Sequence, residues 1–333
     1  MSVEKILGEW RKKEFKPVYW IYGEEDYYID VLTEYAEHHI LSESEASFNL
    51  SVFYGKDAEW AAIINACRRY PMFSEKQVVI LKEAQQMNSF ELLEPYIREP
   101  LPSTIFVIAY KGKGPDKRKA ISKLLEKNTV VFHSQELRED KIHDWIATHV
   151  KQQGFLIDNK AVTLLEEHLG NDLSRISNEI KKISLNLKDE KTIDEDVIEK
   201  YVGISKEYNV FELQAAIAHK DLAKAIKIIS YFESNPKSVS IHLALPTLYA
   251  FFSKVYSVFG MSNKSEAALK PVFYFNSVSL QQGMAAAKNY GYSGVERIIL
   301  LLNHYNLKSL GVGDSGSDGA TLMKEMVVKM MLK

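Results

Sequence analysis

The chain has 333 residues, of which 46% are hydrophobic and 26% charged, and its formal net charge is −2. This length supports two or three domains, whereas the near-zero charge excludes a basic protein that binds nucleic acid over its whole surface. The single cysteine excludes an intrachain disulfide and a cysteine-rich zinc site, and no apolar run approaches the ~20 residues of a membrane span. We therefore expect a cytoplasmic protein with no metal, no cofactor and no membrane partner.

Strand and helix patterns alternate over roughly the first 135 residues, which predicts an α/β domain with a mainly parallel sheet. Most of the strand runs are apolar throughout, as expected of strands covered on both faces. The expected strands are Val18–Tyr22, Phe48–Phe53, Gln77–Leu81, Thr104–Ala109 and Thr129–Phe132, and the expected helices are Tyr28–His39, Glu59–Ala66, Phe90–Tyr96 and Lys117–Glu126.

Beyond residue 138 the strand signal disappears and amphipathic helical patterns follow one another. Gly203 ends a first helical group, and a glycine-rich connector over 311–319 precedes the last helix. We expect an α/β domain over 1–137, a small helical domain over 138–205 and a larger helical domain over 206–333. The expected helices are Glu139–Gln152, Asn159–Leu169, Leu173–Leu185, Ile193–Tyr201, Val210–His219, Leu222–Phe232, Ser238–Phe259, Gly294–Leu307 and Ala320–Leu332.

The first strand leads into a glycine and a helix, which is the order of a P-loop phosphate-binding site. Counted from Gly23, the motif places its second glycine, lysine and hydroxyl where this chain has Tyr28, Ile29 and Asp30. Four carboxylates lie within the eight residues 23–30 and would repel a triphosphate. If the fold is that of a P-loop ATPase, this copy of the site is degenerate and binds no nucleotide.

The metal-binding half of such a site is also missing. A Walker B strand ends in an acidic residue that reaches magnesium, but the strand after Gln77 ends at Lys82. Two interpretations are open: a degenerate ATPase site, or a fold that never held one, with Lys82 a simple strand end. No hydrolase motif stands in its place, so we expect no catalytic residue.

The segment from Tyr70 to Lys76 is the unusual surface candidate. Pro71 ends the preceding helix, so Met72 and Phe73 fall on a short connector before the next strand. Large apolar residues on a connector either fill the local core or anchor a protein partner. The residues alone favour the core role slightly.

Two further features are candidates for DNA contact. An exposed tyrosine at the break near Tyr290 would stack on a base, although aromatic packing between helices is the commoner role. A basic cluster after the fourth strand would meet phosphates, although the residues alone favour a solvated turn: Lys111, Lys113, Lys117, Arg118 and Lys119.

Taken together and in order, these segments resemble the delta subunit of the bacterial DNA polymerase III clamp loader. The resemblance covers essentially the whole chain and rests on the runs 17–26, 70–79, 117–119, 170–182 and 210–229. The chain departs from the family pattern at Asn306, near a position where an aspartate is common.

The resemblance implies an AAA+-like (P-loop NTPase-type) domain with no ATPase activity, a helical lid and a C-terminal helical collar. It implies a non-catalytic subunit that opens the sliding clamp (beta subunit), held by its collar to the motor subunits (tau/gamma) and the delta-prime subunit, with primer–template DNA in the complex. Carried over by position, Met72 and Phe73 are the clamp-binding pair, with Tyr70 beside them, and Tyr290 is a DNA contact. The resemblance favours the anchor role for Met72 and Phe73 over the core role. It also implies a location at the bacterial replisome, near the nucleoid.

Two alternatives of other classes remain. An active P-loop ATPase or helicase-loader-like enzyme predicts nucleotide binding, against which the residues at 28–30 and 82 argue. A DNA-binding repair factor that uses the 111–119 cluster predicts strong, salt-sensitive DNA binding by the isolated chain.

Overall fold

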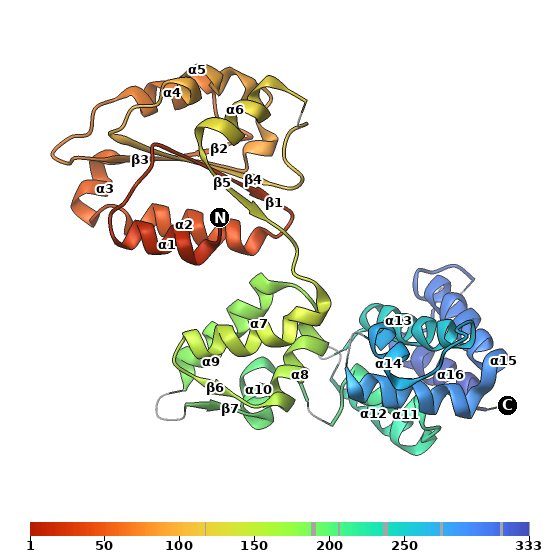
Figure 1. Ribbon diagram of the computed structural model, residues 1–333. Coiled ribbons are helices and arrows are strands. Elements are labelled where there is room, and N and C mark those ends of the chain that lie inside the picture. The colour runs from red at the N-terminus through yellow and green to blue at the C-terminus, as the bar shows by residue number, and fades with distance from the viewer. Residues whose placement is uncertain are drawn as a thin grey trace. The chain divides into compact units, whose positions relative to one another are not determined.

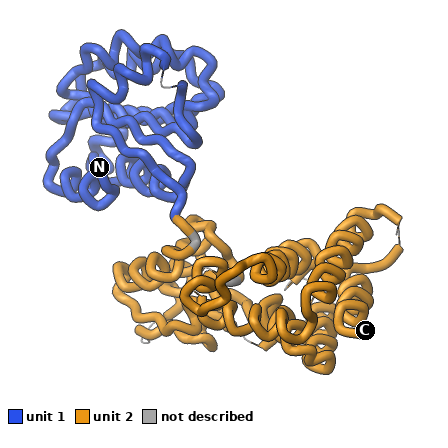
Figure 2. Tube along the Cα trace, turned by 45° about the vertical axis from the view of Figure 1, so that its right-hand side comes forward, with its two compact units in different colours: residues 1–137 blue, residues 138–333 orange. Residues whose placement is uncertain are grey.

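The computed structural model describes residues 1–116, 118–187, 191–205, 207–235, 239–273, 276–313 and 316–332. It divides into two compact units, residues 1–137 and 138–333 (Figure 2). The second unit spans both of the helical domains that the sequence predicts, and their separation at residue 205 stays a prediction. In the described parts of the chain, no helix combines the length and apolar character needed to cross a membrane.

Unit 1 is built on a parallel sheet of five strands in the order β2-β3-β4-β1-β5. From β1 the chain crosses to β2 at the far edge, returns strand by strand to β4, and then passes over β1 to reach β5. The strands are β1 (Val18–Gly23), β2 (Leu50–Tyr54), β3 (Gln77–Lys82), β4 (Thr104–Lys111) and β5 (Val130–Ser134). The mixed α/β class with a parallel sheet, predicted from the alternating patterns, is confirmed.

Helices cover both faces of this sheet because right-handed crossovers change face when the direction of strand addition reverses. Helices α1 (Val3–Arg11) and α2 (Asp26–His39) lie on one face (Figure 1). Helices α4 (Trp60–Arg68), α5 (Glu94–Arg98) and α6 (Ala120–Asn128) lie on the other. Strand β1 contributes alternate side chains to the two cores, and this burial on both faces explains its continuous apolar sequence.

The expected strand Phe48–Phe53 begins later than predicted, because Phe48 and Asn49 end a helix that the sequence analysis missed. This helix, α3 (Glu43–Asn49), starts at a capping box in which the Ser42 and Glu45 side chains each bond the other residue's backbone N–H. The stretch expected as helix Phe90–Tyr96 is instead a 3₁₀ turn, η2 (Phe90–Leu93), followed by α5; a second 3₁₀ turn, η1 (Ala84–Gln86), precedes it.

Unit 2 is mainly helical, but the expectation of no strand beyond residue 138 is wrong. A two-stranded parallel sheet pairs β6 (Leu156–Ile157) with β7 (Thr192–Ile193), and two residues are too few to leave a periodic signal. Around this sheet lie α7 (Glu139–Gln152), α8 (Asn159–Leu169), α9 (Leu173–Asn186) and α10 (Glu195–Val202).

The remaining helices share a core cluster whose members all lie between Val210 and Met331. They are α11 (Val210–Ala218), α12 (Leu222–Ser234), α13 (Ile241–Phe259), α14 (Glu266–Leu269) with the 3₁₀ turn η3 (Lys270–Phe273), α15 (Ser277–Ser309) and α16 (Gly319–Met331). Ser238, the expected start of α13, and residues 314 and 315 of the expected connector lie outside the described residues. Helix α15 is broken at Gly291, where φ is 64° and ψ 179°, as the sequence predicts.

Candidate functional site

The tip loop, residues 69–76 between α4 and β3, presents apolar side chains to solvent. Tyr70 is 76% exposed, Met72 48% and Phe73 93%. These exposures exclude the core role that the residues alone had favoured, because an almost fully exposed Phe73 fills no local core. Exposed large apolar side chains grouped on one loop are typical of a binding surface.

The conformation of the tip loop is fixed through its backbone. Pro71 cannot extend α4, which ends at Arg68. The side chain of Asn49, only 1% exposed, then bonds both backbone groups of Met72: the Met72 N–H donates to Oδ1 at 2.7 Å, and Nδ2 donates to the Met72 carbonyl at 2.8 Å.

Both ends of the tip loop are tied to neighbouring elements. At its start, Gln77 Nε2 lies 2.5 Å from the carbonyl oxygen of Arg69, whose own guanidinium donates to the Phe48 carbonyl at 3.0 Å. Near its end, the Ser74 hydroxyl donates to the Glu45 carboxylate at 2.8 Å. The Glu45 carboxylate accepts three hydrogen bonds, from the Ser42 N–H, the Ser42 hydroxyl and the Ser74 hydroxyl, and these lower its pKa to about 2.

Phe73 itself has φ of +55°, in the left-handed region that side chains other than glycine rarely adopt. Such a residue costs about 1–2 kcal/mol relative to the right-handed conformation. The hydrogen bonds to the residues on either side, Met72 and Ser74, oppose this cost. A large apolar side chain held outward against its backbone preference points to a functional position.

At the carboxyl end of β1, the turn that follows Gly23 is occupied by protein contacts. The N–H groups of Glu24 and Glu25 donate to the Ser134 carbonyl at 2.9 and 3.4 Å, and the Tyr27 N–H donates to the Glu25 carboxylate at 3.1 Å. A Cβ atom at Gly23 would lie 1.8 Å from that same carbonyl oxygen, so glycine is required here by the approach of β5. These donors are therefore directed away from a phosphate.

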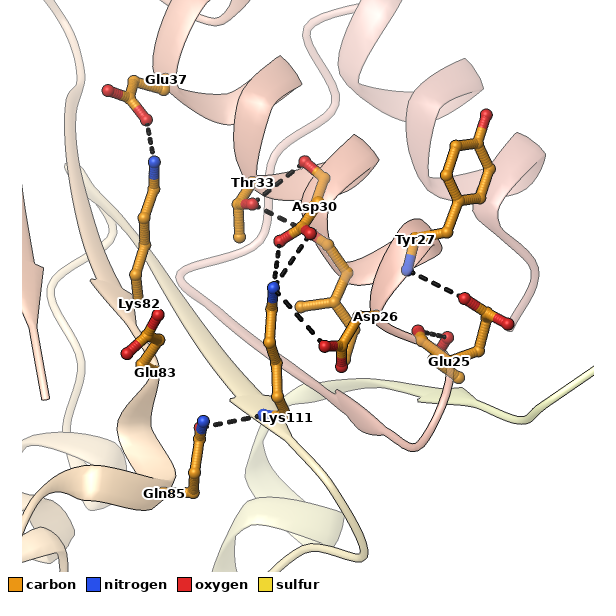
Figure 3. A network of polar contacts seen from close by, with 12 residues as sticks. Glu25, Asp26, Tyr27, Asp30, Thr33, Glu37, Lys82, Glu83, Gln85 and Lys111 are labelled. Carbon is orange, nitrogen blue, oxygen red and sulfur yellow. Dashed lines mark hydrogen bonds and ion pairs between the residues drawn. The ribbon is translucent and has the colours of Figure 1, made fainter. Parts of the chain in front are cut away.

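The space between the carboxyl ends of β1 and β4, here called the crevice, holds a lysine side chain (Figure 3). Lys111, at the end of β4, places its Nζ 2.8 Å from Asp30 Oδ1 and 3.8 Å from Asp26 Oδ2. Burial raises the pKa of Asp26; burial opposes the charge of Lys111, but its hydrogen bond to Asp30 raises the lysine pKa. In an open parallel sheet, ligands bind where neighbouring strands send their chains to opposite faces, and β1 and β4 are such a pair. An ion-pair network fills that position here.

At the end of β3, Lys82 Nζ lies 2.5 Å from Glu37 Oε2 of α2 (Figure 3). A metal-binding site would have a carboxylate at position 82, whereas here a lysine forms an ion pair with a carboxylate. Among the residues that the structure describes, no group of three histidine, cysteine or acidic side chains gathers as a metal site. The other residues at the expected P-loop positions, Tyr28 and Ile29, lie in α2, and Ile29 is fully buried under the sheet.

The described members of the basic cluster are each near a carboxylate. Lys113 is 3.7 Å from Glu24, Arg118 is 2.7 Å from Asp116, and Lys119 is 2.6 Å from Glu91. The side chains of Lys113 and Arg118 are nevertheless 88% and 91% exposed, whereas that of Lys111 is held in the crevice. Lys117 lies outside the described residues. DNA contact by this cluster stays a prediction.

Tyr290 is packed between helices at the break in α15. Its hydroxyl donates to the Ile217 carbonyl at 2.7 Å, and its ring meets Phe252 edge-on at 6.3 Å between centroids. Burial raises the pKa of its hydroxyl. This geometry fits the aromatic-packing alternative, and base stacking by Tyr290 stays an untested prediction.

Three residues outside the tip loop hold it in place through hydrogen bonds, and the sequence did not predict this role for them: Glu45, Asn49 and Gln77. One signal was available for the first, since Ser-x-x-Glu over 42–45 is the pattern of a capping box. No local pattern marks Asn49, whose bond to Met72 joins residues 23 positions apart.

Comparison with known proteins gives these features a context. Residues 19–135, which include the tip loop and both halves of the expected nucleotide site, match the family model described as DNA polymerase III, delta subunit. The chain is also 24% identical to the DNA polymerase III subunit delta of Bacillus subtilis (strain 168), over 97% of this chain and 95% of that protein. The chain is thus similar to DNA polymerase III delta subunits over almost its whole length. The predicted resemblance is confirmed.

A solved structure agrees with this similarity at the level of the fold. The Bacillus subtilis DNA clamp loader delta protein superposes with a TM-score of 0.63 at 21% identity, and each chain is covered over its full length. The arrangement of a parallel-sheet unit followed by a helical unit is thus shared with a delta subunit.

Proposed function

We propose that this chain is the non-catalytic subunit of a clamp loader that binds the ring-shaped sliding clamp and opens it for loading onto primed DNA. The observation that carries the proposal is the tip loop, which holds Met72 and Phe73 outward in a defined conformation. The similarity to the DNA polymerase III delta subunits suggests the partner: a ring-shaped clamp with an apolar pocket.

The energy available is sufficient for this role without any covalent chemistry. Burying one methionine and one phenylalanine in a pocket offers about 3–5 kcal/mol of apolar transfer before ordering costs. An anchor that binds better to the opened ring shifts the clamp toward that form by the difference in affinity.

In this proposal unit 1 is an AAA+-like domain with a degenerate nucleotide site, and the chain has no intrinsic enzymatic activity. The ion pair between Lys111 and Asp30 and the Ser134 contacts with the β1 turn support it, because they fill the position of a nucleotide. The ATP cycle that governs presentation of the tip then belongs to the motor subunits.

The helices from residue 206 onward form the collar that joins the tau/gamma motor subunits and the delta-prime subunit, and residues 138–205 form the lid. The helices from residue 206 onward share one core cluster, between Val210 and Met331, and this supports a separate collar. The proposed contact with those subunits is made by Tyr249 and Leu300. These side chains are 50% and 64% exposed and line one groove of about 480 Å³ between α13 and α15.

DNA enters the proposal only through the assembled complex. Lys113 and Arg118, the most exposed described members of the basic cluster, are proposed to meet primer–template phosphates there. The net charge of −2 supports weak DNA binding by the isolated chain.

The test is binding of the purified full chain to its cognate sliding clamp, with Met72→Ser/Phe73→Ser against wild type. We expect the double variant to lose clamp binding while it keeps its fold by circular dichroism. The matched control, Tyr249→Ser/Leu300→Ser, removes two comparably exposed apolar side chains and should bind the clamp normally but fail to join the motor subunits. Wild-type protein that folds and does not bind the clamp would overturn the proposal.

A further inference from the structure

We propose that Asn49 is the positioning residue of the tip loop: its buried amide holds the backbone of Met72 so that the apolar tip is formed before the clamp arrives. The inference rests on the proposed function and adds a residue that itself touches no partner. Asn49 ends α3 and is 1% exposed, whereas the side chains that it positions lie in solvent.

The geometry matches the chemistry of a neutral amide. Met72 presents one N–H and one carbonyl, and Asn49 supplies one acceptor at 2.7 Å and one donor at 2.8 Å. A carboxylate of the same size accepts but cannot donate, and alanine does neither. Only an amide or a protonated carboxyl satisfies both backbone groups in this space.

The tip has little apolar burial of its own to hold it in place. Tyr70, Met72 and Phe73 are all exposed, and Phe73 adopts a left-handed backbone conformation that an unrestrained loop rarely populates. The fixed conformation therefore depends on hydrogen bonds, and Asn49 makes two of them, both to Met72, the residue before Phe73. A loop ordered in advance binds more tightly because its conformational entropy is lost before the encounter.

The experiment compares clamp affinities of wild type, Asn49→Ala and Asn49→Asp near neutral pH and at about pH 5. Near neutral pH we expect both variants to bind about tenfold or more weakly than wild type, because the loop is no longer ordered in advance. At the lower pH, Asn49→Asp should recover toward wild type, because burial raises the pKa of the introduced carboxyl and its protonated form donates to the Met72 carbonyl. Asn49→Ala should show no such recovery.

Amide hydrogen exchange of the free chain gives an independent readout. The Met72 N–H should be protected in wild type and exchange rapidly in Asn49→Ala. The matched control is Ile29→Val, a core substitution in α2 away from the tip loop, which should change neither clamp affinity nor exchange at Met72.

Wild-type affinity in both Asn49 variants, or an equal loss in Ile29→Val, would overturn the positioning role while leaving the clamp-binding proposal intact. Failure of wild type itself to bind the clamp would overturn the proposed function and, with it, the role of Asn49 in binding. Protection at Met72 that is unchanged in Asn49→Ala would contradict the inference whatever the clamp does.

Discussion

At the scale of single residues, Phe73 joins two features that stability alone does not favour. Its backbone lies at φ +55° and its side chain is 93% exposed. Neither feature contributes to folding, so a substitution at this position separates stability from binding.

Phe73→Gly is expected to keep the free energy of unfolding or raise it by up to about 1 kcal/mol, because glycine adopts a left-handed conformation without steric cost, although it adds entropy to the unfolded chain. The same variant should lose most of its clamp affinity. Chemical denaturation and a clamp-binding titration measure the two effects. A variant that is clearly destabilised, or that binds the clamp as wild type does, would show that Phe73 has a structural role instead.

At the scale of elements, α3 supports the tip loop, and Glu45 links the two. Its carboxylate caps the helix through Ser42 and accepts from Ser74 in the tip loop. The folded pKa of about 2 lies below the ordinary value of 4.5, so this group stabilises the fold above about pH 4.5, and its contribution is lost as the pH falls to about 2.

Glu45→Gln should therefore be less stable than wild type near neutral pH, and the difference between the two should shrink as the pH falls through that window. Urea denaturation of both proteins at a series of pH values measures it. A difference that stays constant with pH would show that the Glu45 charge is not what stabilises α3 and the tip loop.

A second pair of elements, β1 and β4, is joined at its carboxyl ends by Lys111. Lys111→Met should cost about 1–2 kcal/mol of stability, because it leaves Asp26 and Asp30 close together without their cation. Lys113→Met is the matched control: its side chain is 88% exposed, so it should stay within about 0.5 kcal/mol of wild type. Equal effects in denaturation experiments would mean that the crevice network is no more than surface charge.

At the scale of the whole molecule, the sequence predicted that unit 1 has five strands, because most of them are short apolar runs bounded by turn residues, but it placed the start of β2 two residues too early. It predicted the site only in part. That Met72 and Phe73 stand on a connector followed from Pro71, but the backbone of Met72 is bonded to Asn49, 23 positions away, and no local pattern encodes such a contact.

Lys111 is a second case in which a contact between residues distant in sequence could not be predicted. The sequence grouped it with neighbouring basic residues as a DNA contact, whereas parallel pairing of β4 with β1 brings it beside Asp30, 81 residues away in the chain. Helix α3 was missed because its polar, serine-rich sequence carries little hydrophobic periodicity, although its capping box was visible.

In the proposed function, this chain opens the clamp by binding alone, through the tip loop and without nucleotide. The direct measurement is fluorescence resonance energy transfer between dyes placed across one ring interface of the clamp, as the full chain is added in the absence of ATP. We expect a fall in transfer with wild type and with Tyr249→Ser/Leu300→Ser, and no change with Met72→Ser/Phe73→Ser. Unchanged transfer while wild type is bound, or a change that requires ATP bound to this chain, would contradict the proposed function.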